Sequence, residues 1–241
     1  MKKLLSVVCF TWLFIDLQAQ VYPTAEYIAY TFMISQEQRM ATSFAIKYKG
    51  KKYLVTARHL FDSKIKSGDQ ILAPFYFYNR ESKIESKIFF HENPEIDLAV
   101  LNFSDSLPGL SFAEISKTYD QPTLGQELIF LGFPLGFSSK AVGNGLLPLL
   151  KKASLAGVLS LSKSTMFLLD GHNNSGFSGG PVLVKDPDTN KLSLLGVVTS
   201  YINEPKRIGA VGSEFIFNEN SGIIVCVPSN YIRELIDQIK K

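Results

Sequence analysis

Hydrophobic positions in this chain come in short runs separated by turn-forming residues, and helical periodicity is scarce. Runs such as "YLVTA", "DLAVLNF", "ELIFLGF" and "GIIVCV" are rich in β-branched and aromatic residues. Many short strands of this kind are typical of a β-barrel or β-sandwich. The segments "KYKGKKYL", around Gly50, and "KDPDTNKL" predict hairpins between neighbouring strands. The pattern therefore predicts an all-β protein.

The C-terminus departs from this pattern. In "PSNYIRELIDQIKK" four apolar side chains fall on one face of a helix, those of Ile232, Leu235, Ile236 and Ile239. Ser229 precedes this segment and is a candidate N-cap, because a serine hydroxyl can accept a hydrogen bond from a free N–H of the first turn. We expect a C-terminal α-helix over residues 229–240.

The N-terminus has the features of a cleavable secretory signal. Lys2 and Lys3 are followed by an apolar run, Leu4–Ile15, and Ala19 is a small residue at a plausible cleavage point. The run is too short to span a bilayer, which takes about 20 apolar residues. A buried N-terminal helix is the alternative. We expect residues 1–19 to be a signal peptide, the protein to be secreted or periplasmic, and no membrane contact after signal removal.

Composition narrows the class of protein further. The chain is 46% hydrophobic and 20% charged, which is ordinary for a folded globular protein. The net charge of +3 is too small to indicate a nucleic-acid partner. After signal removal Cys226 is the only cysteine, so we expect no internal disulfide and a buried, apolar role for this side chain. The histidines and the cysteine lack metal-ligand spacing, so no metal and no cofactor is expected.

The glycine-rich stretch "HNNSGFSGGPVLV", residues 172–184, carries the strongest chemical signal. A phosphate-binding loop is excluded because Pro181, and not lysine, follows the glycines. The stretch matches G-x-S-x-G, but a hydrolase with that nucleophile elbow needs a histidine later in the chain. All three histidines precede Ser178. The order that remains for a nucleophilic site is histidine, acid, serine.

Two residues fit the first two places of that order. His59 follows the apolar run "YLVTA", and Asp97 stands directly ahead of "LAVLNF". A carboxylate against so apolar a run must find a hydrogen-bonding partner, and the N–H of a neutral imidazole is one. We expect His91, which follows "IFF", to be a surface or turn residue.

Three segments now carry a resemblance. "TARHL", "DLAVL" and "GFSGGPV" in this order resemble the signature segments of the chymotrypsin-like (trypsin-like) serine peptidases. "IFLGFPLGF" and "VPSNYI" are most similar to the bacterial high-temperature-requirement type. The resemblance covers roughly Ala41 to Ile236, and the residues after the last strand leave no room for the PDZ module of that type.

The resemblance implies a fold and a division of the chain. The fold is two six-stranded antiparallel β-barrels of the chymotrypsin-like type with a C-terminal α-helix. Residues 20–118 form the N-terminal barrel, which carries His59 and Asp97. Residues 119–241 form the C-terminal barrel, which carries Ser178, and the polar stretch Ser116–Glu127 connects the two.

It also implies roles. Ser178 is the nucleophile, His59 takes its proton and returns it to the leaving amine, and Asp97 orients the imidazole. The backbone N–H groups of Gly176 and Ser178 form the oxyanion hole. The function implied is an exported serine endopeptidase that acts on polypeptide substrates through an acyl-enzyme. The alternatives are a catalytically silent, peptide-binding pseudoprotease and an esterase using the same three residues.

Further positions follow from the same resemblance. His172 falls near the base of the pocket that sorts the substrate side chain, and Thr199, Ser200 and Tyr201 fall on the substrate-binding strand. Thr199 is either the residue that hydrogen-bonds the aspartate or an ordinary strand threonine. Phe177 replaces the aspartate or asparagine usual before the nucleophile and cannot pair with a newly freed N-terminus. We therefore expect activity without any cleavage after signal removal; the sequence specifies no oligomeric state.

Overall fold

The computed structural model describes residues 25–77, 80–103, 113–114, 121–140, 146–187, 191–210 and 213–239. The predicted signal, residues 1–19, and the predicted boundary at residues 118 and 119 lie outside the described residues. Within these ranges, no helix has the length and apolar character needed to cross a membrane.

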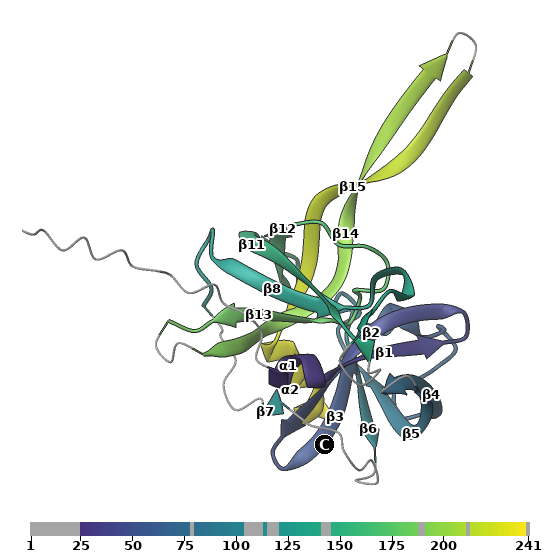
Figure 1. Ribbon diagram of the computed structural model, residues 1–241, viewed down its shortest axis with the longest axis vertical. Helices are drawn as coiled ribbons and strands as arrows, with labels where there is room; N and C mark the ends of the chain where they lie inside the picture. Colours follow the sequence, from purple (N-terminus) through teal and green to yellow (C-terminus); the bar gives the residue numbers. More distant parts are fainter. Residues whose placement is uncertain are drawn as a thin grey trace, which may run out of the picture.

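Six strands of the first half form a ring, in which each strand pairs in antiparallel fashion with its neighbours (Figure 1). The order around the ring is β1 (Thr31–Gln36), β4 (Gln70–Phe77), β5 (Arg80–Phe90), β6 (Ala99–Phe103), β3 (Lys51–Thr56) and β2 (Arg39–Tyr48). The short β7 (Ala113–Glu114) adds to β2 in parallel, and α1 (Ala25–Ala29) precedes β1. The predicted hairpin at Gly50 is confirmed. Lys49 and Gly50 both have positive φ, so this two-residue turn matches the twist of its strands.

Six further strands close a second barrel. Their order is β8 (Glu127–Gly132), β11 (Leu149–Ser160), β12 (Thr165–Asp170), β15 (Ser213–Pro228), β14 (Leu192–Ala210) and β13 (Pro181–Lys185). A two-stranded pair, β9 (Ser139–Lys140) and β10 (Leu146–Leu147), follows β8 along the chain. The all-β fold of two barrels predicted from the sequence is confirmed.

The C-terminal helix α2 (Asn230–Gln238) packs into an apolar cluster to which both barrels contribute. Of the four residues predicted to form its apolar face, Ile232, Leu235 and Ile236 are buried, and Ile239, just past the end of the helix, is partly buried against the same cluster. Ser229 stands before the helix but does not cap it with its side chain. Its backbone is already helical, and its hydroxyl donates to the carbonyl oxygen of Leu194 at 3.2 Å. The predicted N-cap role is therefore wrong.

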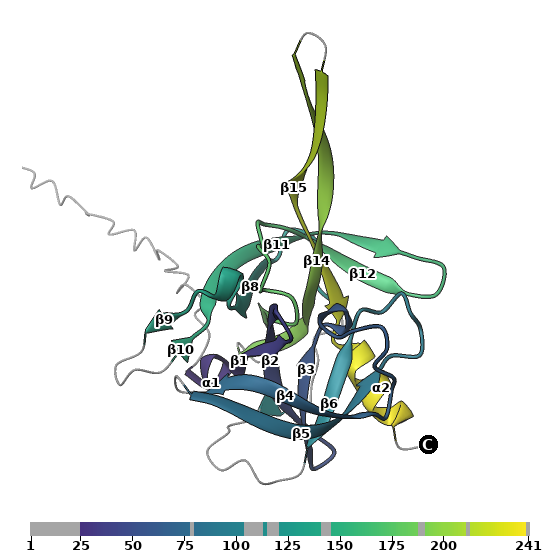
Figure 2. The same ribbon diagram turned by 90° about the vertical axis from the view of Figure 1, so that its right-hand side faces the viewer.

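One feature was not predicted from the sequence. Beyond the second barrel β14 and β15 continue as a long two-stranded hairpin, which stands away from both barrels in two perpendicular views (Figures 1 and 2). The paired residues run from Asn203 with Asn220 to Ala210 with Ser213. We call residues 203–210 and 213–220 the arm. Its strands pass through Pro205 and several charged residues, so the sequence there shows no clear apolar alternation.

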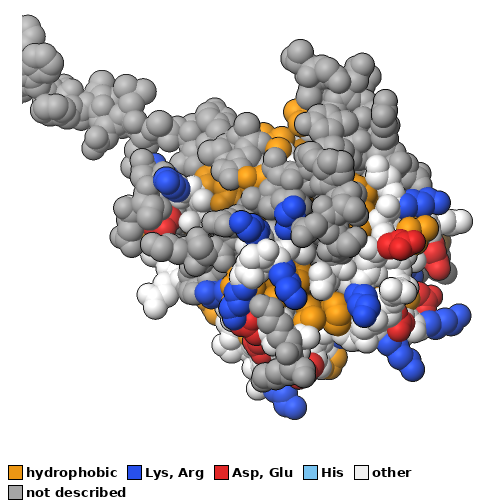
Figure 3. All heavy atoms as spheres, turned by 90° about the horizontal axis from the view of Figure 1, so that it is seen from below, with side chains coloured by type: hydrophobic (Ala, Val, Ile, Leu, Met, Phe, Trp, Pro, Cys, Tyr) orange, Lys and Arg blue, Asp and Glu red, His pale blue; other side chains and the backbone are white. Residues whose placement is uncertain are grey.

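The surface seen from below the first barrel carries charges of both signs. Lys and Arg side chains are spread over this face, and Asp and Glu side chains lie among them (Figure 3).

Candidate active site

His59 and Asp97 are brought together by the pairing of two strands. β3 and β6 are antiparallel neighbours, with Thr56 opposite Ala99. His59 follows β3 in a short 3-10 turn, η1 (Arg58–Leu60), and Asp97 lies two residues before β6. Because the end of β3 lies beside the start of β6, the two side chains meet. The His59 Nδ1–H donates to Asp97 Oδ2 at 2.6 Å, and the His59 backbone N–H donates to Asp97 Oδ1 at 2.9 Å.

Ser178 lies on the second barrel, in the loop between β12 and β13. The Thr42 N–H of the first barrel donates to the Ser178 carbonyl oxygen at 2.8 Å, which ties this loop to β2. Gly179 has a φ of +84°, and a Cβ there would collide with the Thr42 carbonyl oxygen and the Thr56 hydroxyl. Only glycine therefore allows the two barrels to approach this closely behind Ser178.

Thr42 also holds the nucleophile loop, which is the loop between β12 and β13 that carries Ser178. The sequence did not indicate this role. Its hydroxyl donates to the Gly176 carbonyl oxygen at 2.6 Å and accepts from the Phe133 N–H at 3.0 Å. Its own carbonyl oxygen accepts a hydrogen bond from the Thr56 hydroxyl at 2.7 Å. The Thr42 side chain is fully buried. It therefore fixes the loop from the first barrel through two polar atoms, its backbone N–H and its hydroxyl.

The side chains of His59, Asp97 and Ser178 open into one cleft of about 640 Å³. The Ser178 hydroxyl donates to the Thr199 carbonyl oxygen at 3.2 Å. The residues that line the cleft come from both barrels: Arg39, Met40, Ala41, His59, Leu60, Asp97, Asn173, Asn174, Ser175, Gly176, Ser178, Thr199, Ser200, Tyr201 and Asn203. Ser200 and Tyr201 therefore border the cleft, as the resemblance implied.

Gly176 and Ser178, which line the same cleft, also supply backbone N–H donors. Among the described residues, the N–H groups of Gly176 and Ser178 have no hydrogen-bond partner. Gly176 has a φ of +104°, and a Cβ there would collide with the Phe133 carbonyl oxygen. The loop thus needs glycine at this position, and it leaves two donors beside a hydroxyl, an arrangement that can stabilise a developing oxyanion.

Phe177 anchors the loop by apolar contact. Its side chain is fully buried in the core of the second barrel, and its ring meets the Phe130 ring edge-on with centroids 4.9 Å apart. A Cβ on Gly132 would collide with the Phe177 ring. The Lys151 ammonium lies 5.7 Å from the ring centroid, and burial lowers the pKa of this lysine. An ion pair at position 177 is replaced here by packing.

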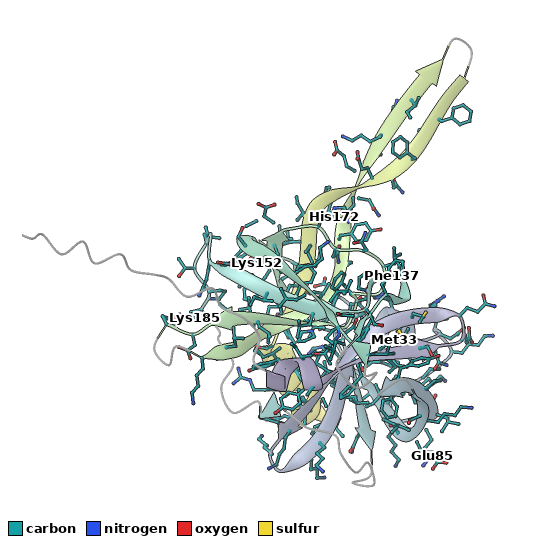
Figure 4. The ribbon with its side chains drawn as sticks, viewed as in Figure 1. Met33, Glu85, Phe137, Lys152, His172 and Lys185 are labelled. Carbon is teal, nitrogen blue, oxygen red and sulfur yellow. The ribbon has the colours of Figure 1, made fainter. Side chains whose placement is uncertain are left out.

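His172 does not line the cleft. It is exposed at the foot of the arm (Figure 4), and its neighbour Asn173 borders the cleft instead. Asn173 is 2% exposed, and its Oδ1 has no hydrogen-bond partner within the described part of the chain. Its carbonyl oxygen accepts from the Asn220 Nδ2 at 2.7 Å. Sequence reasoning missed Asn173, because one step along the chain changes which side chain faces the cleft.

Thr199 borders the cleft, but its hydroxyl donates to the Val225 carbonyl oxygen at 3.3 Å. Both hydrogen bonds that the structure gives Asp97 are to His59. Of the two roles considered for Thr199, the hydrogen bond to the aspartate is not made.

His91 and Cys226, for which the sequence predicts no catalytic role, are both buried. His91 is not a surface residue: it is 4% exposed, its Nδ1 accepts from the Asn93 N–H at 3.1 Å, and its ring packs edge-on against Tyr231. Its apolar cover comes from α2, which is distant in sequence.

Cys226 is fully buried, as predicted, and burial raises the pKa of its thiol, so it is an inert core residue. Within the described ranges no group of His, Cys, Asp and Glu side chains could hold a metal ion.

One protein family and several solved structures are similar to this chain. The model of the "trypsin-like peptidase domain" family matches residues 41–192. Three solved structures are similar. The HtrA-type protease AlgW has a TM-score of 0.59 and 18% identity over 89% of this chain and 61% of its own, so this chain spans under two thirds of its length. Rv3671c from M. tuberculosis, in an inactive form, scores 0.55 with 15% identity over 90% of this chain and 88% of its own. A serine endoprotease from Yersinia pestis scores 0.54 with 14% identity over 91% and 67%. No curated protein sequence matches this chain.

Proposed function

Since this chain belongs to the trypsin-like peptidase domain family, we propose that it is an exported serine endopeptidase that hydrolyses peptide bonds of polypeptides. One observation carries the proposal. Ser178 and the His59–Asp97 pair border the same cleft, on elements that belong to different barrels. Two backbone N–H groups without a partner among the described residues belong to the same cleft. Each is a part that acyl transfer to a serine requires.

The mechanism follows from these positions. When a polypeptide occupies the cleft, the Ser178 hydroxyl releases the Thr199 carbonyl by rotating about its Cα–Cβ bond and donates to His59 Nε2. The oxygen then attacks the carbonyl carbon of the substrate while His59 takes the proton. Asp97 accepts from the opposite ring nitrogen, so it keeps Nε2 unprotonated before attack and stabilises the imidazolium afterwards.

The oxyanion is the second requirement. As the substrate carbonyl becomes tetrahedral, its oxygen accepts from the N–H groups of Gly176 and Ser178. The proton on His59 passes to the leaving amine, an acyl-enzyme remains on Ser178, and a water molecule activated by His59 hydrolyses it. No step needs a metal or a cofactor.

A fluorophosphonate probe tests the proposal directly, because it reacts with an activated serine. We expect labelling of the wild-type protein and its loss in Ser178→Ala and His59→Ala. Peptide turnover should fall by roughly 10⁶ in Ser178→Ala. Ser175→Ala is the matched control, since Ser175 lies in the same loop and also borders the cleft; this variant should be labelled as fast as the wild type.

Two outcomes would contradict the proposal. Labelling that does not depend on Ser178 would indicate a pseudoprotease that only captures peptides. Labelling with ester turnover but without cleavage of any polypeptide would indicate an esterase.

A further inference from the structure

The arm exposes large apolar side chains away from either barrel. Figures 1 and 2 show it projecting from the second barrel in two perpendicular views. Ile208 is 59% exposed, Phe215 67% and Phe217 45%. A two-stranded hairpin is marginally stable in water without a third strand or a packing partner. Side chains of this size on a free hairpin therefore indicate that something covers them in use.

The strand register places these side chains on one face. Ile208 lies opposite Phe215, and Lys206 lies opposite Phe217. Directly opposed residues of an antiparallel pair share a face, and so do residues two apart on one strand. We call Ile208, Phe215 and Phe217 the apolar stripe. Ile216 lies opposite Arg207 and therefore belongs to the other face of the arm.

The polar end of the same face lies toward the barrel. Glu204 lies opposite Glu219, and the Lys206 ammonium lies 2.8 Å from a Glu204 oxygen and 3.8 Å from a Glu219 oxygen. The hydrogen bond that Lys206 donates to the Glu204 carboxylate raises the pKa of Lys206. The face thus changes from an ion-paired foot to an apolar outer half, and any ligand of the stripe must offer apolar groups.

The foot of the arm is continuous with the cleft. β14 is a single strand whose residues Ser200 and Tyr201 border the cleft, and Asn203, the first residue of the arm, borders it too. On β15, Asn220 donates to the Asn173 carbonyl oxygen in the nucleophile loop. A polypeptide bound beside Ser178 therefore already lies at the foot of the arm. Ile208 is seven residues beyond Tyr201, or roughly 23 Å at the rise of a β-strand. An extended substrate spans that distance with about seven of its own residues.

We infer that the arm is a substrate-binding exosite, whose apolar stripe holds an extended, apolar segment of the polypeptide at a distance from the bond that is cleaved. The inference rests on the proposed function. The substrate class it specifies is unfolded polypeptide, because most folded proteins bury the extended segments that carry several large apolar side chains. The exosite adds binding energy without contacting the reacting atoms.

Binding to the Ser178→Ala protein tests the exosite without any chemistry. The probe is fluorescein-labelled, reduced and carboxymethylated α-lactalbumin, which stays unfolded, and a glycine–serine peptide of similar length is the control ligand. In a variant with Ile208→Ser, Phe215→Ser and Phe217→Ser we expect the Kd for α-lactalbumin to rise at least about tenfold. Ile216→Ser changes an equally exposed residue on the opposite face and should change the Kd by less than about twofold. Binding of the control peptide should not change in either variant.

The same substitutions in the protein with Ser178 intact separate the two proposals. We expect kcat/KM for α-lactalbumin to fall by the same factor as binding, while the rate of fluorophosphonate labelling stays at the wild-type value. A stripe variant that binds α-lactalbumin as tightly as the wild type would overturn the exosite. If the stripe variant loses α-lactalbumin binding but the wild type is never labelled, the proposed catalysis fails and the arm is a polypeptide-binding site without a protease.

Other occupants give other results, each of which overturns the inference. Sedimentation velocity that finds a wild-type dimer and a monomeric stripe variant would assign the stripe to a second copy of the chain. Binding of the wild type, but not of the stripe variant, to vesicles of anionic phospholipid would assign it to a membrane surface.

Discussion

Thr42 couples the two barrels at the site through its hydrogen bonds. Its N–H, hydroxyl and carbonyl oxygen bond to Ser178, Gly176, Phe133 and Thr56. Two of these partners belong to the nucleophile loop. Because the hydroxyl holds the Gly176 carbonyl oxygen, it also fixes the orientation of the neighbouring backbone amides. Thr42 is therefore a positioning residue in the proposed reaction.

The variant Thr42→Val tests that role, since valine has nearly the shape of threonine but no hydroxyl. It leaves the Phe133 N–H and the Gly176 carbonyl oxygen buried without this partner, which should lower the free energy of unfolding by about 1–3 kcal/mol. We also expect kcat to fall about tenfold or more, which corresponds to about 1.4 kcal/mol of lost transition-state stabilisation, with KM for a peptide substrate little changed. Steady-state kinetics and urea unfolding measure the two effects.

Thr42→Ser is the matched control. It keeps the hydroxyl and removes one methyl group, so it should lose stability but keep kcat. Equal kcat values for the valine variant and the wild type would show that the hydroxyl is only structural.

Phe177 leads to a prediction about maturation. Its buried ring anchors the loop by packing against Phe130, and phenylalanine cannot form an ion pair. We expect the protein recovered from an exporting host to begin at Gln20 and to hydrolyse peptides as isolated. N-terminal sequencing and a peptidase assay on the same sample check both points. A precursor that is inert until it is cut elsewhere would contradict the prediction.

At the scale of elements, strand pairing explains why His59 and Asp97 meet although 38 residues separate them. The antiparallel register of β3 and β6 brings the two side chains together, because the end of β3 lies beside the start of β6. The serine is placed differently, on a loop that glycines allow to pack against β2. A rigid pair on one barrel and a tightly held loop on the other suit a site whose geometry must be kept to within a fraction of an ångström.

The helix α2 packs against the two barrels, whereas the arm projects away from them. α2 lays an apolar face into the cluster shared by both barrels. The arm continues two strands of the second barrel into solvent, with apolar side chains exposed. One element therefore stabilises the relation of the barrels, and the other is available for binding.

At the scale of the whole molecule, a polar contact joins the barrels beside the site. The Glu95 carboxylate, in the segment of the first barrel that leads to Asp97, accepts hydrogen bonds from Ser164 and Ser162 of the second barrel, both at 2.8 Å. These bonds, that of Ser164 first, lower the pKa of Glu95. The charged form is thus favoured in the folded protein.

This pKa shift predicts a pH dependence of stability. A carboxyl whose pKa is lowered on folding stabilises the protein above its unfolded pKa and loses that contribution as the pH falls through the lowered pKa. We therefore expect Glu95→Gln to be less stable than the wild type at neutral pH, and the difference to shrink as the pH is lowered to about 3. Urea unfolding at a series of pH values measures it.

Glu92→Gln serves as the comparison, because Glu92 lies in the same turn and its carboxylate makes no hydrogen bond with the described residues. Its stability difference from the wild type should be small, because the substitution removes no hydrogen bond to a described residue. A difference for Glu95→Gln that does not change with pH would contradict the role given to the carboxylate.

Much of the fold was predictable because the signals were local. Short apolar runs indicated strands, the left-handed turn at Gly50 was visible as a glycine between lysines, and the 3.6-residue period marked the buried face of α2. The arm was not predicted because its strands mix polar, charged and apolar residues around Pro205 without a regular period, and a hairpin outside the barrel need not have an apolar core face.

The sequence by itself determined which chemistry is available to this protein. The order of His59, Asp97 and Ser178 and the glycines around the serine excluded other nucleophilic arrangements, since residue types and their order do not depend on folding. Only the tertiary structure decided which side chains surround them. Thr42 is 134 residues from Gly176, Asn173 and not His172 faces the cleft, and the register of β14 and β15 gathers the apolar stripe on one face. Those relations depend on strand register and on contacts between distant segments, which no local pattern of residues records.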